Sequence, residues 1–84
     1  MVDKAISEKA KKYANLYKDI LINDGAEAYE KRKKQDLDYG LITISEMTLA
    51  TMLTGLYVDV VQGKLSRQEA LQRQRNLFAL LVIV

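Results

Sequence analysis

The feature that most constrains this sequence is a long apolar segment near its middle that carries very little charge. Between residues 41 and 63, the only charged side chains are Glu46 and Asp59. Small or polar residues recur at steps of three or four along one narrow stripe, namely Thr48, Thr51, Gly55, Asp59 and Gln62. A helix that is apolar around most of its circumference belongs in the middle of a structure. We therefore predict a central apolar helix over about residues 44–62.

The uncharged part of this segment is too short to predict a membrane span. The stretch between Glu46 and Asp59 has twelve residues, whereas a bilayer requires about 20 predominantly apolar residues. Charged side chains are spread through the first twenty residues, which argues against an apolar secretory leader there. The sequence has no cysteine, whereas small secreted domains commonly depend on disulfides. We expect no membrane contact and a cytoplasmic location.

Local capping patterns predict where the helices of the second half begin and end. A capping box pairs Ser or Thr with a Glu three residues later, and two pairs have this spacing: Thr43 with Glu46 and Ser66 with Glu69. Gly63 suits the left-handed conformation that closes many helices. We therefore predict a C-terminal helical hairpin, in which the central helix is followed by a last helix over about residues 67–80. Residues 41–44 are rich in β-branched side chains and predict a short extended piece.

The first half of the chain has its own helical patterns. Apolar residues recur there at steps of three and four: Ile6, Ala10, Tyr13, Tyr17 and Ile20. This spacing predicts an amphipathic helix over residues 3–22. Asp24 and Glu27 have capping-box spacing and predict a second, charged helix over residues 24–35. The alternative is one continuous helix through Gly25, at a cost of about 1 kcal/mol.

Together these patterns predict a single all-α domain of three to four helices over residues 1–84. Residues 36–40 are predicted as the connector from the charged helix to the central helix, and an apolar tail follows the last helix. A chain of 84 residues is too short for several domains. It also buries only about 60–65% of the surface that its unfolded form exposes, so its core is small.

Apolar surface that the chain cannot cover by itself predicts self-association. Residues 77–84 are all apolar, although chain termini are usually polar. This tail and the central helix together exceed what one amphipathic helix and one mostly polar helix can cover. We predict a homodimer or higher oligomer with these candidate contact residues: Met52, Leu56, Val60, Phe78, Leu81 and Ile83. The alternative is a tail that folds back onto its own chain, including as a strand beside residues 41–44.

The residue types that most catalytic and metal sites require are missing from the sequence. It has no histidine and no cysteine, which excludes the common nucleophilic triads and the usual zinc and haem ligands. Asp36 and Asp38 flank a single residue, but a hard cation needs more converging oxygens than these two carboxylates supply. We therefore interpret them as solvated loop carboxylates. We expect no enzymatic activity, no cofactor and no metal site.

Basic residues make nucleic acid a candidate partner. The net charge is only +2, too small to require a polyanionic partner by itself. Side chains that could contact phosphates occur in one run and in the last helix: Lys31, Arg32, Lys33, Lys34, Arg67, Arg73 and Arg75. The alternative is a solvated helix face with internal ion pairs, because Glu27 and Glu30 lie four residues before two of these lysines.

The layout of the second half resembles that of a DNA-binding family. A β-like run, a helix, the Gly63 turn and a helix capped by Ser66 resemble the ribbon-helix-helix DNA-binding dimers over about residues 41–80. The resemblance implies paired strands that enter the major groove and present polar side chains to the bases. Here the strand positions carry no Arg, Lys, Gln or Asn; they are Leu41, Ile42, Thr43 and Ile44.

These observations support three functional hypotheses. The first is a small, non-enzymatic, self-associating helical protein that binds another macromolecule, in an accessory or regulatory role and of phage or mobile-element origin. The second is a nucleic-acid-binding transcriptional regulator with the ribbon-helix-helix layout. The third is an oligomer that sequesters a small ligand in tyrosine-lined pockets, using Tyr13, Tyr17 or Tyr57. Each of these tyrosines is more readily interpreted as a core or interface residue.

Overall fold

The computed structural model describes residues 4–82 of the chain, with side chains described through residue 79. The described residues form four α-helices and no strand, which confirms the predicted all-α fold. In chain order the helices are α1 (Lys4–Asp24), α2 (Ala26–Asp38), α3 (Ile44–Val61) and α4 (Arg67–Val82).

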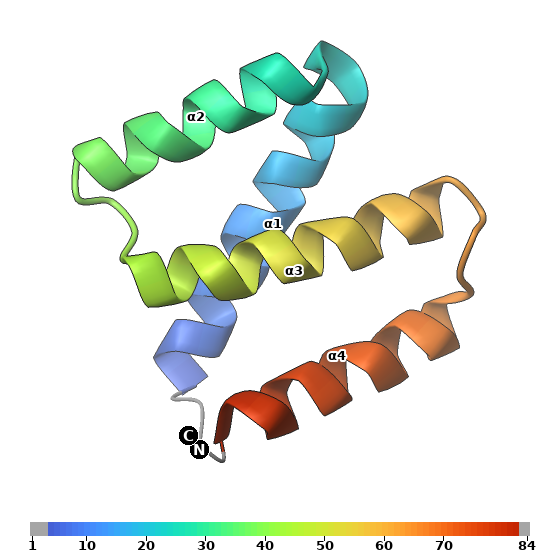
Figure 1. Cartoon of the computed structure of the whole chain (residues 1–84). Helices are drawn as coiled ribbons and strands as arrows, with labels where there is room; N and C mark the ends of the chain where they lie inside the picture. Colours follow the sequence, from blue (N-terminus) through green and yellow to red (C-terminus); the bar gives the residue numbers. More distant parts are fainter. Residues whose placement is uncertain (1–3, 83–84) are drawn as a thin grey trace.

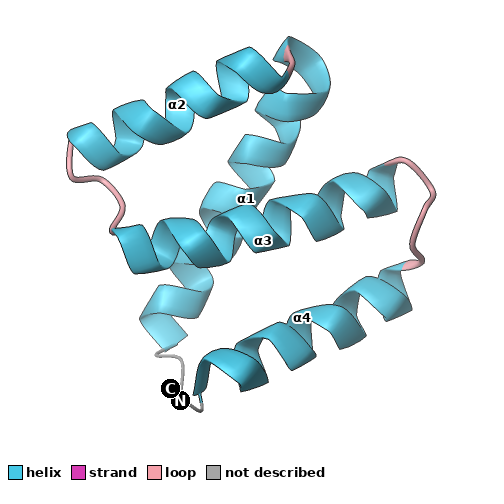
Figure 2. Cartoon of the chain, viewed as in Figure 1, coloured by secondary structure: helices cyan, strands magenta, loops and turns pink. Residues whose placement is uncertain are grey.

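The helices are arranged in two layers. In Figure 1, α3 lies in the front layer between α2 and α4, and α1 crosses behind α3. Figure 2 shows the loops that join the helices; α3 and α4 run antiparallel and form the predicted hairpin. The molecule measures 31 × 29 × 16 Å along its principal axes. The thin dimension fits two layers of helices at the usual separation of about 8–10 Å. Among the described helices, α3 therefore has a packing partner behind it but none in front.

The core lies where the apolar stripe of α1 crosses α3. Ala10 and Ala14 have no exposed surface, and such small side chains let two helices approach closely. Tyr17, one turn further along α1, is also fully buried. The rest of the core cluster comes from α2, the loop after it and α3: Tyr29, Ile42, Met47, Leu49, Ala50 and Leu53.

Helices α1 and α2 are separate, with the break at Gly25 that the sequence predicts. Gly25 has a φ of +93°, a conformation that residues with a Cβ rarely adopt. The predicted capping box of Asp24 with Glu27 is wrong, because helical hydrogen bonding in α1 continues as far as the Gly25 N–H. Gly25 itself occupies the N-cap of α2, without a side-chain hydrogen bond. The charged helix therefore spans Ala26–Asp38 rather than residues 24–35.

The loop between α2 and α3 begins later than predicted. Residues 36–38 continue α2, so the connector consists of residues 39–43. The extended piece predicted at 41–44 is wrong: Ile42 inserts into the core, Thr43 is the N-cap of α3, and no strand occurs among the described residues. In the single chain, residues 41–43 are therefore loop and Ile44 begins α3.

Both capping boxes of the second half are confirmed. The Thr43 N–H donates to Glu46 Oε1 at 2.8 Å, and the Glu46 N–H donates to Thr43 Oγ1 at 3.2 Å. Ser66 and Glu69 make the same two bonds at 3.3 and 3.1 Å. Gly63, with a φ of +77°, follows the end of α3 as predicted. Local sequence therefore sets both turns that flank the central helix.

The described part of the apolar tail folds onto its own chain as a helix. Helix α4 continues to Val82, beyond the predicted end at residue 80, and Leu77 and Phe78 pack against the core. This arrangement agrees with the alternative in which the tail returns to its own chain, as a helix rather than a strand. The side chain of Leu81 and all of Ile83, both predicted contacts for self-association, lie outside the described residues.

Candidate functional site

Helix α3 is long and apolar enough, by length and composition alone, to cross a membrane. It has 18 residues with a mean hydropathy of 1.2. These 18 residues include Glu46 and Asp59 as well as the uncharged stretch between them. In the fold, α1 packs along one side of α3, and the buried Glu46 forms an ion pair with Lys9 at 3.1 Å. One side of α3 is therefore part of the protein core.

The opposite side of α3 is uncovered and largely apolar. Ile44 is 77% exposed and Met52 is 46% exposed. Thr48, one turn after Ile44, and Gly55, one turn after Met52, are also exposed. The four residues therefore share one side of the helix. We call these four residues the open face of α3. These four residues carry no charge, Asp59 follows one turn after Gly55 on the same side, and no helix of the described chain covers the face. The two large apolar side chains exposed here, Ile44 and Met52, make it a candidate interaction surface.

Of the predicted self-association residues that the structure describes, only Met52 lies on the open face. Leu56 and Phe78 pack against the core, and Val60 lines a cavity between helices. Ile44 is the most exposed large apolar residue of the described chain. It was not among the predicted contact residues, because the apolar pattern of the central helix does not indicate which side α1 covers.

The four residues of the predicted basic run on α2 do not all face solvent: two make contacts within the fold and two are exposed. Arg32 bonds a buried carboxylate on its own helix. The Lys33 amine lies 4.4 Å from the centre of the Tyr29 ring, so its charge is held against the core. Lys31 and Lys34 are exposed. The run therefore does not present four free cations on one face.

The ion pairs of α2 also differ from those predicted. Glu30 pairs with Lys33 at 3.6 Å, and Lys34 pairs with Asp38 at 3.8 Å, rather than Glu30 with Lys34. The three arginines predicted as phosphate contacts on α4 are all exposed: Arg67, Arg73 and Arg75. Of these, only Arg67 lines the cavity between α1, α3 and α4. The structure thus does not bring the two predicted basic groups together at one site.

A buried polar network joins α1 to α2, and sequence analysis missed it. The Tyr17 hydroxyl donates to Asp36 Oδ2 at 2.7 Å, and Arg32 Nε donates to Asp36 Oδ1 at 3.1 Å. Asp36 is 1% exposed, so its assignment to a solvated loop is wrong, because α2 continues through residue 38; Asp38 is exposed, as predicted. Burial and the hydrogen bond to Asp36 raise the pKa of the Tyr17 phenol far above its ordinary value. The Asp36 carboxylate therefore serves to join the helices.

The Glu46 carboxylate makes the fold sensitive to acid. The Thr43 backbone N–H, and with it the Lys9 amine, hold the pKa of Glu46 below its ordinary value. Such a group stabilises the fold fully above its unfolded-state pKa, and this contribution is lost as the pH falls through the lowered, folded-state pKa. We therefore expect the free energy of unfolding to fall between about pH 5 and pH 3, and to fall less in Glu46→Gln.

Denaturant unfolding at these two pH values, followed by circular dichroism, measures the effect. Glu27→Gln, which changes an exposed glutamate of α2, serves as the control and should lose as much stability in acid as the natural chain. Equal losses in Glu46→Gln and the natural chain would show that Glu46 does not contribute.

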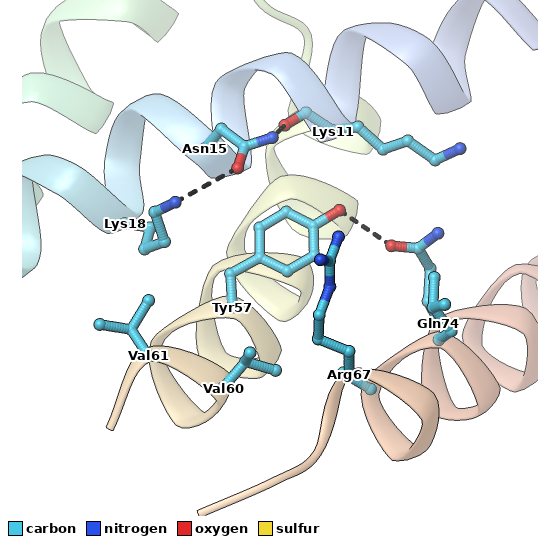
Figure 3. A pocket seen from close by; sticks show the side chains of 10 residues that line it. Lys11, Asn15, Lys18, Tyr57, Val60, Val61, Arg67 and Gln74 are labelled. Atoms are coloured by element: carbon cyan, nitrogen blue, oxygen red, sulfur yellow. Dashed lines mark hydrogen bonds between the residues drawn. The ribbon is translucent and has the colours of Figure 1, made fainter. Parts of the chain in front are cut away.

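A cavity of about 360 Å³ lies between α1, α3 and α4. Three helices line it: Lys11, Asn15 and Lys18 from α1, Tyr57, Val60 and Val61 from α3, and Arg67, Ala70, Leu71 and Gln74 from α4. Figure 3 shows the Arg67 side chain reaching from the start of α4 toward Tyr57 and Gln74. The Tyr57 hydroxyl donates to Gln74 Oε1 at 2.8 Å, and burial raises the pKa of the Tyr57 phenol. Of the three tyrosines predicted for ligand pockets, Tyr57 lines this cavity, whereas Tyr13 and Tyr17 belong to the core packing, with ring centres 5.7 Å apart.

Comparisons with protein-family models, with curated proteins and with solved structures found no match to this chain. Two features of the described structure are candidate binding sites. One is the open face of α3, and the other is the cavity that α1, α3 and α4 form together.

Proposed function

We propose that this chain is a self-associating helical protein that acts by binding, and that a second copy covers the open face of α3. The observation that carries the proposal is the exposure of Ile44 and Met52 on the most apolar helix. Full burial of one large apolar side chain stabilises by about 1.5–3 kcal/mol relative to leaving it in water. Covering this face with a second chain would recover part of that free energy.

A second copy suits the open face because the face is complementary to itself. A two-fold axis brings the same surface together from both chains. The four residues of the open face carry no charge that would repel a second copy, and Asp59 lies one turn beyond them. Thr48 and Gly55 have small side chains, and nothing lies within 4 Å of the position that a Cβ on Gly55 would take. A partner helix can therefore approach closely. The thin, 16 Å dimension of the molecule leaves this side of α3 accessible.

The binding role extends to a further macromolecule, in the cytoplasm. Pairing through α3 leaves the outer surfaces of α2 and α4, which carry charged and polar side chains, open to such a partner. An accessory or regulatory role suits a chain of this length. We do not propose catalysis, because the sequence lacks histidine and cysteine and both oxygens of the buried Asp36 carboxylate are bonded within the fold. Nor does the basic run favour nucleic acid, because Arg32 and Lys33 are held by internal contacts.

Single-cysteine variants test the location of the interface, because the natural sequence contains no cysteine. Thr48→Cys and Met52→Cys place a thiol on the open face, one helical turn apart. In a dimer with a two-fold axis, a residue close to the axis lies close to the same residue of the second copy. A disulfide can then form if their two Cα atoms are about 4.4–6.8 Å apart. We expect mild oxidation to give a covalent dimer in at least one of these variants, measured by electrophoresis without reductant.

Gln72→Cys is the matched control, because Gln72 is exposed on α4 and lies away from the open face. It should form covalent dimer only at the slow rate of random collisions. If all three variants cross-link at that same slow rate, the open face is not where two copies meet. Circular dichroism of each reduced variant shows whether the fold is retained.

A further inference from the structure

The cavity between α1, α3 and α4 is lined by both cationic and apolar side chains. Arg67 and Lys18 contribute positive charge from two different helices. Val61 and Leu71 contribute apolar surface, and both are exposed at its rim. No acidic residue of the described chain lines it. A site lined by cationic and apolar side chains, with no carboxylate, suits a ligand that has an anionic group at one end and an apolar body at the other.

Arg67 is the residue best placed to bind the anionic group. Among the described residues it takes part in no ion pair, in contrast to Arg32, which pairs with a carboxylate on its own helix. Its side chain extends into the space beside Tyr57 and Gln74 (Figure 3). A guanidinium group can bind both oxygens of a carboxylate at once, which gives orientation as well as affinity.

The lysines of α1 add to the positive potential unequally. Lys18 Nζ lies 3.4 Å from Asn15 Oδ1 and 3.6 Å from the exposed carboxylate of Asp19, so its charge is only partly compensated near the cavity. Lys11 Nζ lies 5.6 Å from the centre of the Phe78 ring, so Lys11 contributes mainly the apolar stem of its side chain. Arg67 and Lys18 therefore supply most of the positive charge at the cavity, from two different helices.

The volume of the cavity indicates a small ligand. About 360 Å³ lies at the lower end of the range for small-molecule sites, about 300–1,000 Å³. This corresponds to a carboxylate on a short acyl chain or a single aromatic ring. A longer chain or a folded peptide would extend beyond the rim formed by Val61 and Leu71.

We propose that this cavity binds a small amphipathic carboxylate, with Arg67 bound to the carboxylate and Val60, Val61 and Leu71 around the apolar body. Tyr57, fixed by its hydrogen bond to Gln74, forms the wall between the two parts. This site lies on α1, α3 and α4 and shares no residue with the open face of α3. The site and the proposed dimer are therefore independent, and each can fail without the other.

Octanoate, which has ten non-hydrogen atoms, is the probe for this site. Isothermal titration calorimetry with the full chain at low ionic strength should show saturable binding of one octanoate per chain. Octylamine, with the same apolar length and the opposite charge, should not bind saturably. Arg67→Gln should weaken octanoate binding by about tenfold or more, since a hydrogen bond to a charged group contributes about 1.5–3 kcal/mol.

Arg75→Gln is the matched control, because Arg75 is exposed on the same helix and does not line the cavity. It should change the affinity for octanoate by less than about twofold. Both substitutions remove one charge from an exposed position of α4, so both variants should keep the helical circular dichroism of the natural chain.

Backbone amide chemical shifts identify where octanoate binds. The expected changes are at residues 60, 61, 67, 70 and 71. Absence of saturable binding, equal binding of octylamine, or equal affinity of the two arginine variants would each overturn the proposal. So would shift changes centred on Ile44 and Met52, which would mean that octanoate simply coats the open face of α3.

Discussion

Replacing Asp36 by alanine is expected to lower the free energy of unfolding by about 3–5 kcal/mol. The substitution leaves the Tyr17 hydroxyl without its acceptor at 2.7 Å and the Arg32 guanidinium without the carboxylate at 3.1 Å. A chain of 84 residues has a total stability of about 4–13 kcal/mol, so this one change could remove a large part of it. Urea or guanidinium unfolding followed by circular dichroism measures the loss.

Asp38→Ala is the matched control for this prediction. Asp38 is the same residue type in the same helix, but it is exposed and its nearest cation, Lys34, is also exposed at 3.8 Å. Exposed ion pairs of this kind contribute about 0–1 kcal/mol. Asp36→Asn keeps an oxygen acceptor and should fall between the two alanine variants. Equal stabilities of Asp36→Ala and Asp38→Ala would contradict a structural role for the buried network.

Replacing Leu53 by alanine is expected to have an effect of similar size, about 3–5 kcal/mol. Leu53 has no exposed surface and belongs to the cluster that α1 and α3 form together. Removing its side chain both loses apolar burial and leaves a cavity, because the surrounding helices relax only partly. The α1–α3 contact is the most extensive in the fold, so a cavity there affects the whole domain.

Leu16→Ala makes the same chemical change at a partly exposed position of α1. Its cost should be about 1 kcal/mol, because a side chain that is partly in water already has less burial to lose. Both variants are unfolded in denaturant at one fixed, low protein concentration, so that any self-association affects them equally. A loss in Leu53→Ala no greater than in Leu16→Ala would show that α3 does not pack on α1 as described.

The sequence predicts the features of this fold that depend on neighbouring residues. The capping boxes at Thr43 and Ser66 are made of residues three positions apart, so their spacing alone indicates the starts of α3 and α4. Gly63 likewise ends α3 through its own backbone conformation. Where a local pattern was misread, at Asp24, the helix before it continued, and Gly25 took the N-cap position instead.

The features that depend on how helices cross could not be predicted in this way. The role of Asp36 requires that α2 continue three residues beyond its apparent end and that Tyr17 approach from another helix. Its spacing of four from Arg32 was a usable signal that the helix continues. Likewise, the apolar periodicity of α3 does not reveal which side α1 covers, so Ile44 could not be identified as exposed.

The cavity around Arg67 depends on tertiary packing even more strongly. Its lining comes from three helices whose residues are separated by up to some sixty positions in the sequence. Arg67 was identified in the sequence as a basic candidate, but for phosphate contacts on a surface rather than for a cavity. Only the folded arrangement separates it from Arg73 and Arg75, which share its helix and its charge but do not line this cavity.

Sedimentation equilibrium of the natural chain over a wide range of concentration tests most directly whether a second copy covers the open face of α3. The expected result is an average mass that rises with concentration toward twice the 9.6 kDa of one chain. Met52→Lys, which places a charge in the middle of the open face, should stay near 9.6 kDa, whereas Gln72→Lys should behave like the natural chain. A natural chain that remains at 9.6 kDa at every concentration, with Met52 still exposed, would contradict self-association through this helix.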